Sequence, residues 1–140
     1  YLICKGAAQA IDFYKQAFGA KEEMRIAGPD GSVGHAEITI GDSRLMLGEE
    51  CAAMGARSPA TIGGSGTGIM LYVEEVDKVF QNALKAGATQ TQPVQDKFYG
   101  DRMGTLTDPF GHVWHIATHI EDVSPEEMGL RSEEMMKSKK

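Results

Sequence analysis

The sequence predicts an α+β fold built from two β-α-β-β-β modules in tandem. An amphipathic helical pattern occurs twice, and each copy follows a short apolar strand and precedes strand-like runs with alternating polarity. Each helical pattern also ends in a similar triplet, Phe18-Gly19-Ala20 in the first half and Ala86-Gly87-Ala88 in the second. This internal repeat predicts that both halves adopt the same structure.

Module one is predicted at residues 1–51. It opens with an apolar run at 1–5 that is typical of a buried strand. In residues 7–18 the apolar side chains recur at spacings of three and four, which predicts a helix with one buried stripe. After a turn signal at 28–31, the run 34–50 contains two strand-like pieces separated by turn residues.

Module two is predicted at residues 68–121, after a linker at 52–67 that is rich in glycine and serine and has no apolar period. The apolar strand 68–73 leads into a second helical pattern at 76–88. A proline-containing loop, a further strand and the final strand 112–119 complete the module. We therefore expect one flexibly connected pair of modules.

The two modules and their linker are predicted to form a single domain at residues 1–121. The remaining segment, 122–140, is predicted to be a helical tail. Ser124 is a favoured residue at a helix N-cap and Pro125 at the first helical position, and acidic residues follow in the first turn. The tail should pack on the outside of the domain.

Composition limits the classes of function. The net charge is −6, and no basic stripe crosses the first 130 residues, so nucleic acid is not an expected partner. No apolar run approaches the roughly 18 residues of a membrane span. The two cysteines, Cys4 and Cys51, lie far apart and outside metal-binding spacings. These features predict a cytoplasmic protein with free thiols.

Strand alternation predicts which side chains share a face, because successive residues leave a sheet on opposite sides. His35 and Glu37 should lie opposite the apolar residues that cover the first helix, and Met46 on the next strand should share their face. On the last strand, Trp114 should pack beneath the second helix and His115 should face away from it. A polar cavity wall is therefore predicted on the side of each sheet without a helix.

The stretch DPFGHVWHI contains two histidines, but they do not form a metal site together. His112 and His115 are three residues apart in a strand and project to opposite sides. His115 and His119 share a face but lie about 13 Å apart, too far to hold one ion. Any metal would need ligands from the other half of the chain.

Three motifs, AIDFYKQAFGA, LYVEEVDKVFQNALKAGA and FYGDRMGTLTDPFGHVW, together resemble the vicinal oxygen chelate superfamily, which contains glyoxalases, bleomycin-resistance proteins and extradiol dioxygenases. The first and third motifs look like the PhnB-like branch, and the resemblance extends from about Tyr1 to Glu121. It implies the glyoxalase/bleomycin resistance fold, in which paired modules curl their sheets into a cup around a small molecule. The cup is assembled either within one chain or across a dimer.

The resemblance also implies where a metal would bind. Its ligand positions fall just before Tyr1, and at Met46, Gly68 and His115. Of the visible three, only His115 is a firm ligand, since glycine has no donor side chain and a thioether suits hard divalent cations poorly. We therefore expect no cofactor, while a divalent metal remains an open alternative.

Candidate catalytic residues are His115 and Glu37, either of which would act as a base in proton transfer next to a carbonyl. Arg102 would clamp an anionic group at the rim of the cavity, although an ion pair with Asp101 is the alternative interpretation. The residues expected to bind the ligand are His35, Met46, Tyr99 and Arg102.

Three functions remain open from the sequence. The first is a glyoxalase-like protein, catalytic or not, that binds a small molecule in a homodimer. The second is a non-catalytic protein that sequesters a drug or an aromatic compound, as bleomycin-resistance proteins do. The third is a metal-dependent lyase, isomerase or dioxygenase whose ligands have moved to His35, Glu37 or Glu49.

Overall fold

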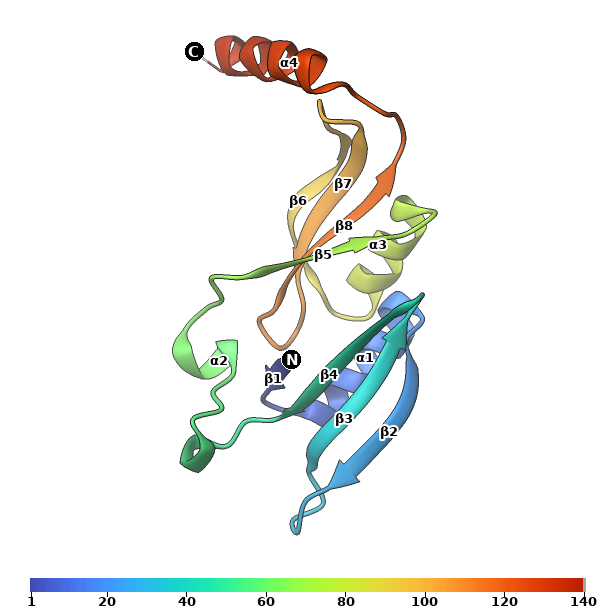
Figure 1. Cartoon of the computed structure of the whole chain (residues 1–140). Coiled ribbons are helices and arrows are strands. Elements are labelled where there is room, and N and C mark those ends of the chain that lie inside the picture. The colour runs from blue at the N-terminus through green and yellow to red at the C-terminus, as the bar shows by residue number, and fades with distance from the viewer. Residues whose placement is uncertain (140) are drawn as a thin grey trace.

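The computed structural model describes residues 1–139 and contains two modules of the same topology (Figure 1). Module one consists of β1 (Leu2–Cys4), α1 (Ala7–Phe18), β2 (Lys21–Ala27), β3 (Val33–Ile40) and β4 (Ser43–Glu49). Module two consists of β5 (Gly68–Tyr72), α3 (Val76–Lys85), β6 (Thr89–Asp96), β7 (Asp101–Thr107) and β8 (Val113–His119). The predicted β-α-β-β-β order is confirmed in both halves, but the segment expected to be a proline-containing loop in module two forms the strand β6.

Each module forms a four-stranded sheet, with strand order β1-β4-β3-β2 in module one and β5-β8-β7-β6 in module two. The first strand of each module runs parallel to the last, and the other neighbours are antiparallel. The last strand also caps its module's helix: Glu49 accepts from the backbone N–H groups of Gly6 and Ala7, and Thr118 Oγ1 accepts from that of Val76. The repeat therefore includes the capping arrangement.

The sequence predicts which strand side chains are buried under the helices, and the structure confirms this for both sheets. Ala36, Ile38, Trp114 and Ile116 are completely buried there. Ala117 differs, because it is buried although it lies on the opposite side. Its partners on the neighbouring strands are Tyr72 and Met103, whose large side chains flank the single methyl group of Ala117.

The two modules share one continuous core. Tyr14 of α1 reaches across the boundary and donates its hydroxyl hydrogen to Asp108 Oδ2 at 2.6 Å, and Trp114 Nε1 donates to the same oxygen at 2.9 Å. The second oxygen, Oδ1, accepts from the backbone N–H groups of Phe110 and His112. Burial, followed by the charge of Asp108, raises the pKa of Tyr14, so its hydroxyl stays a donor.

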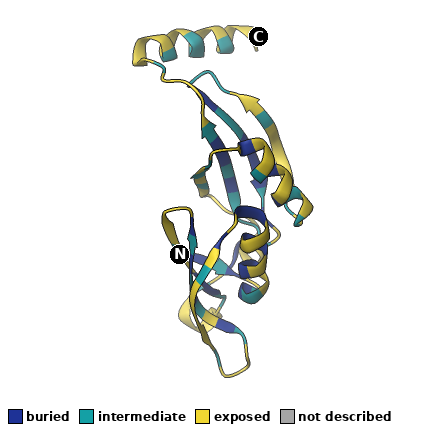
Figure 2. Cartoon of the chain, turned by 90° about the vertical axis from the view of Figure 1, so that its right-hand side faces the viewer, coloured by how far each residue is buried: buried dark blue, intermediate teal, exposed yellow. Residues whose placement is uncertain are grey.

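This core joins the modules through their helix sides. The helices α1 and α3 pack against each other, and the buried residues are concentrated between the helices and the sheets (Figure 2). The opposite sides of the two sheets therefore face outward rather than toward each other. We call each of these sides the open face of its module.

The linker is more ordered than its composition predicts. It contains a short 3₁₀-helix, η1 (Ala52–Met54), and one turn of helix, α2 (Pro59–Ile62). The carboxylate of Glu50 accepts hydrogen bonds from the backbone N–H and hydroxyl of Ser58, which is fully buried, and from the hydroxyl of Thr61. Glu50, just before the linker, therefore holds the linker in place. The composition of the linker itself does not reveal this contact.

Acidification should loosen this part of the linker. The hydrogen bonds from Thr61 and Ser58 lower the pKa of Glu50 to about 2. A lowered pKa in the folded state contributes stability above the ordinary value of the carboxyl group, and that contribution is lost as the pH falls toward 2. We expect the Ser58 and Thr61 amide resonances to shift in NMR spectra with a midpoint near pH 2. In Glu50→Ala, trypsin should cut faster after the exposed Arg57 at neutral pH.

The tail forms α4 (Pro125–Ser138), which begins where Ser124 and Pro125 predict it, with the Ser124 hydroxyl accepting from the Glu127 N–H. Arg131 attaches the helix to the domain through the carbonyl of Phe98. None of its residues is buried, and it extends beyond the far end of module two (Figure 1). Lys140 lies outside the described residues. No helix within residues 1–139 has the length and apolarity to cross a membrane.

Candidate functional site on the open sheet faces

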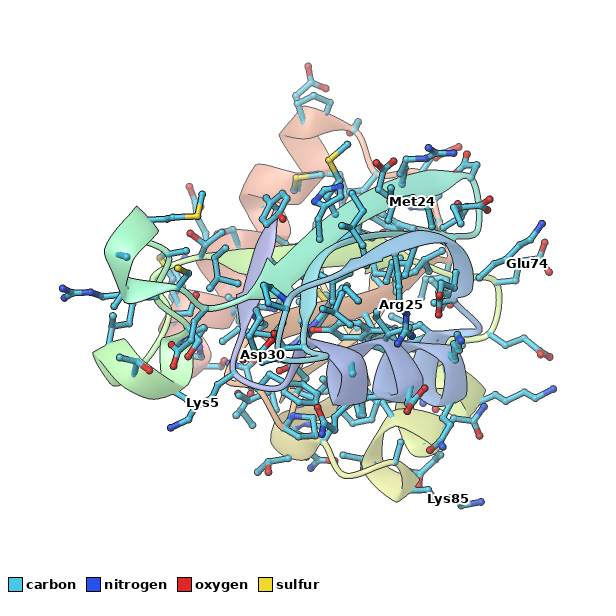
Figure 3. The ribbon with its side chains drawn as sticks, turned by 90° about the horizontal axis from the view of Figure 1, so that it is seen from below. Lys5, Met24, Arg25, Asp30, Glu74 and Lys85 are labelled. Carbon is cyan, nitrogen blue, oxygen red and sulfur yellow. The ribbon has the colours of Figure 1, made fainter. Side chains whose placement is uncertain are left out.

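The open face of module one carries large apolar side chains that stay partly exposed among residues 1–139. Met24 and Ile26 on β2 are 37% and 55% exposed, and Met46 on β4 is 41% exposed. Met24 pairs with Glu37 and shares its face, whereas the next residue, Arg25, turns back toward α1 (Figure 3). Contiguous exposed apolar residues on one side of a sheet are typical of a binding surface.

Four polar side chains form a hydrogen-bonded chain on the same face. The Tyr1 hydroxyl lies 2.8 Å from His35 Nδ1, and His35 Nε2 lies 3.3 Å from Glu37 Oε2. Arg44 donates to the other oxygen, Glu37 Oε1, at 3.0 Å. The rings of Tyr1 and His35 are also stacked, with centroids 5.5 Å apart. We call this set the Tyr1–Arg44 network.

The network changes the expected role of Glu37. Its hydrogen bonds with His35 and then Arg44 lower its pKa, so Glu37 is an ionised acceptor with both oxygens engaged. This arrangement does not favour Glu37 as the base. Sequence reasoning missed Tyr1, although Arg44 could have been found because alternation places it beside Glu37.

His115 lies on the open face of module two, as alternation predicts. Its Nδ1 is 2.9 Å from Thr105 Oγ1 on β7. Its ring covers Gly68 on β5, where an added Cβ would lie 2.5 Å from His115 Nε2. The absence of a side chain at residue 68 therefore gives the imidazole its position.

Other side chains of module two surround His115 with apolar and aromatic groups. Met70 and Tyr72 project from β5 and are exposed. Tyr99, predicted to bind the ligand, donates to Met103 Sδ at 3.7 Å, and Met103 lies on the open face. Burial, followed by the charge of Asp101, raises the pKa of Tyr99, so its hydroxyl stays protonated.

A second polar cluster lies at the end of this face. The buried Asp101 accepts from the Tyr72 hydroxyl at 2.7 Å and lies 3.0 Å from His119 Nδ1. His119 Nε2 is 2.7 Å from the carboxylate of Asp122. Asp101 first, and then Asp122, raise the pKa of His119. Nothing in the local sequence pattern indicated Asp101 as a buried acceptor.

Arg102 does not lie at the rim of this face. It pairs with Thr118 on the helix side of the sheet, where its guanidinium binds Asp77 of α3 at 2.8 Å and Asp96 of β6 at 3.0 Å. Neither carboxylate is that of Asp101, the partner that sequence reasoning considered. The structure therefore corrects the prediction of a ligand clamp: Arg102 joins α3 to the sheet.

The predicted site residues fall into two separate groups in one chain. His35, Glu37 and Met46 belong to module one, whereas His115 and Tyr99 belong to module two. A cleft of about 1090 Å³ runs between the modules beside β5, but none of these five residues lines it. Its lining includes Phe18, Ile40, Met70, Tyr72, Lys78 and His119.

The side chains at the implied metal positions do not fit a divalent cation. Gly68 has no donor, and Met46 offers only a thioether. Glu49, considered as a displaced ligand, is bound to the N-terminus of α1 instead. Within residues 1–139, no three His, Cys, Asp or Glu side chains gather as metal ligands would.

Comparisons with known proteins agree with this fold. A family model described as Glyoxalase/Bleomycin resistance protein/Dioxygenase superfamily matches residues 2–116. An uncharacterized protein of Mycobacterium bovis is 41% identical over 131 residues, covering 91% of this chain and 86% of the relative.

Solved structures show the same architecture. TioX from Micromonospora sp. ML1 is 27% identical with a TM-score of 0.66, over 85% of this chain and 94% of that one. Protein PA1353 from Pseudomonas aeruginosa is 24% identical with a TM-score of 0.70, over 86% and 96% of the two chains. A PhnB protein from Bacillus cereus, 19% identical with a TM-score of 0.64 over 84% and 95%, shares the fold. The chain therefore belongs to the glyoxalase/bleomycin resistance/dioxygenase superfamily.

Proposed function

We propose that the protein binds a small, largely apolar molecule between two open faces, one from each protomer of a homodimer. One observation carries this proposal: each sheet buries one side under its helix and leaves the other lined with exposed Met and Tyr side chains around a hydrogen-bonded histidine. Surfaces of this composition are stable in water only when they are small or partnered. A ligand enclosed by a second copy would cover both.

The helix-side packing supports a dimer. Because the modules of one chain are joined through α1, α3 and Asp108, their open faces point apart and cannot enclose a ligand together. The outer edges of β2 and β6 have irregular register, and β6 also contains Pro93, which discourages further strand pairing. The edges of β1 and β5 are regular, so we infer that module one of one protomer adjoins module two of the other along them.

The side chains on these faces favour a neutral, aromatic or apolar ligand with one polar group. Methionine side chains adapt to irregular apolar shapes and make favourable contacts with aromatic rings. On module one, the positive charge of Arg44 is already balanced by Glu37. His35 and His115 remain as the polar groups that would orient such a ligand.

Two versions of this function differ in chemistry. The exposed methionines support sequestration, which needs only affinity. The Tyr1–Arg44 network supports an enzyme that transfers a proton next to a carbonyl, since histidine bonded to a carboxylate is a common acid–base arrangement. The misfit of the metal positions disfavours a metal-dependent reaction, and a stoichiometric divalent metal that is lost in His115→Ala would reverse that view.

Mixed dimers test the proposed site directly. His35→Ala and His115→Ala should each weaken saturable binding of aromatic ketones in calorimetry. Mixing the two variants through reversible denaturation should restore tight binding, because each mixed dimer has one site with both histidines. Sedimentation should show a dimer throughout. No recovery in mixed dimers would mean that the two histidines act in the same protomer.

A matched pair of methionines provides the control. Met46→Ala removes apolar area from the open face and should weaken binding. Met54→Ala removes an exposed methionine from η1, away from both faces, and should leave affinity unchanged. Equal effects of the two variants would contradict the location of the site.

A further inference from the structure

The Tyr1–Arg44 network has a definite direction. Tyr1 is 65% exposed, whereas the side chains of His35 and Glu37 are 28% and 19% exposed. A molecule on the open face therefore meets the phenol first, and the imidazole and carboxylate lie behind it. Sequence reasoning had placed the base at Glu37 or His115, and Glu37 is the most enclosed member of the network.

The hydrogen bonds also determine which nitrogen of a neutral His35 carries the proton. Glu37 is ionised and can only accept, so His35 Nε2 must be the donor. Nδ1 is then the unprotonated nitrogen and accepts the hydrogen of the Tyr1 hydroxyl. With its hydrogen directed at His35, the Tyr1 oxygen presents its lone pairs to the open face.

Two further contacts hold the network in place. Arg44 binds the second oxygen of Glu37, which keeps that carboxylate ionised and oriented. Gly48 leaves room for the phenol, because a Cβ at that position would lie 2.9 Å from the Tyr1 oxygen. The arrangement resembles a hydroxyl–histidine–carboxylate triad in which a phenol replaces the serine hydroxyl.

We propose that the Tyr1 oxygen accepts a proton from a C–H bond next to the carbonyl of the bound ligand. As that proton reaches Tyr1, the phenol's own proton moves to His35 Nδ1, and the electron pair of the broken C–H bond stays on the ligand as an enolate. Glu37, which Arg44 holds in place, positions His35 and stabilises its imidazolium form. Reversal of both transfers restores the protein, so the step needs no oxidant or other reactant. This proposal rests on the ligand site proposed above.

The first test reads the network without any ligand. In ¹⁵N spectra of the histidine side chains, neutral His35 should have its proton on Nε2, and Tyr1→Phe should shift the Nδ1 resonance. In Glu37→Gln, Arg44 should keep its hydrogen bond with the amide oxygen, so that the NH₂ group faces His35 Nε2. Because that NH₂ group donates, the proton of neutral His35 should then move to Nδ1. A wild-type proton on Nδ1, or an Nδ1 resonance unaffected by Tyr1→Phe, would overturn the proposal.

The second test uses acetophenone, an aromatic ketone, in D₂O. The wild type should catalyse deuterium exchange of its methyl group, and Tyr1→Phe should slow this by about 100-fold or more, the usual contribution of general acid–base catalysis. Affinity for acetophenone should change by less than about tenfold, the contribution of one hydrogen bond. Met54→Ala, which changes an exposed side chain of η1 away from both open faces, should retain the exchange rate.

The outcomes separate the two proposals. Binding of acetophenone with equal exchange in the wild type and Tyr1→Phe would contradict the proton transfer alone. No saturable binding by the wild type would contradict the ligand site, and the proton transfer with it. Slow exchange in Tyr1→Phe at nearly unchanged affinity would support both.

Discussion

Replacing Asp108 with alanine is expected to lower the free energy of unfolding by about 3–5 kcal/mol, because it leaves several hydrogen-bond donors of the shared core without an acceptor. The carboxylate accepts from Tyr14 and Trp114 within the shared core and from two turn N–H groups. Without it, the buried donors of Tyr14 and Trp114 have no acceptor, which costs about 1–3 kcal/mol for each. Urea denaturation at a fixed protein concentration measures the change.

Two milder variants show which part of the loss is due to each donor. Asp108→Asn keeps one acceptor oxygen, but its NH₂ group cannot accept from Trp114, so the loss should be smaller than for alanine. Tyr14→Phe removes only the hydrogen bond from Tyr14 to Asp108 and should cost about 1–2 kcal/mol. Asp122→Ala, at a fully exposed aspartate, is the control. A loss below about 1 kcal/mol for Asp108→Ala would contradict the role of this cluster.

The second large effect is expected on binding rather than on stability. In Gly68→Ala the new methyl group would occupy the position of the His115 ring, 2.5 Å from Nε2, so the ring must turn away. That movement breaks the hydrogen bond with Thr105 and removes the imidazole from its present position. We expect about tenfold weaker binding of aromatic ketones, measured by calorimetry, because one hydrogen bond contributes about 1 kcal/mol.

Gly34→Ala is the matched control for this substitution. Gly34 also lies in a strand, but a Cβ there meets its nearest atom at an ordinary contact distance of 3.6 Å. The control should bind like the wild type, and both variants should unfold at similar urea concentrations. If Gly68→Ala bound as tightly as the wild type, His115 would not be a ligand-orienting residue.

Much of the fold was predictable because it depends on neighbours along the chain. Helical spacing predicted α1 and α3, and strand alternation correctly placed Ile38 and Trp114 in the core and His115 outside it. Arg102 is the instructive failure. Alternation along β7 places Arg102 on the helix side, together with the buried Leu106. The prediction failed because the residues around Arg102 were interpreted as a loop, in which alternation does not apply.

Less of the site was predictable, because its hydrogen bonds join distant residues. His35 and Met46 were placed on one face correctly, yet the partner that directs the imidazole, Tyr1, lies 34 residues away. The role of Glu37 also depends on Arg44, which belongs to another strand. Residue type alone does not show whether a carboxylate is free to act as a base or is already bound on both oxygens.

The sequence by itself determined the two modules, the ends of their helices and the faces of their strands. These features follow from steric preferences and periodicity within short segments. Only the tertiary structure decided that the modules meet through their helices and turn their open faces apart. That choice depends on the contact between Tyr14 and Asp108, which are 94 residues apart, and no local pattern encodes a hydrogen bond formed only when two completed modules pack together.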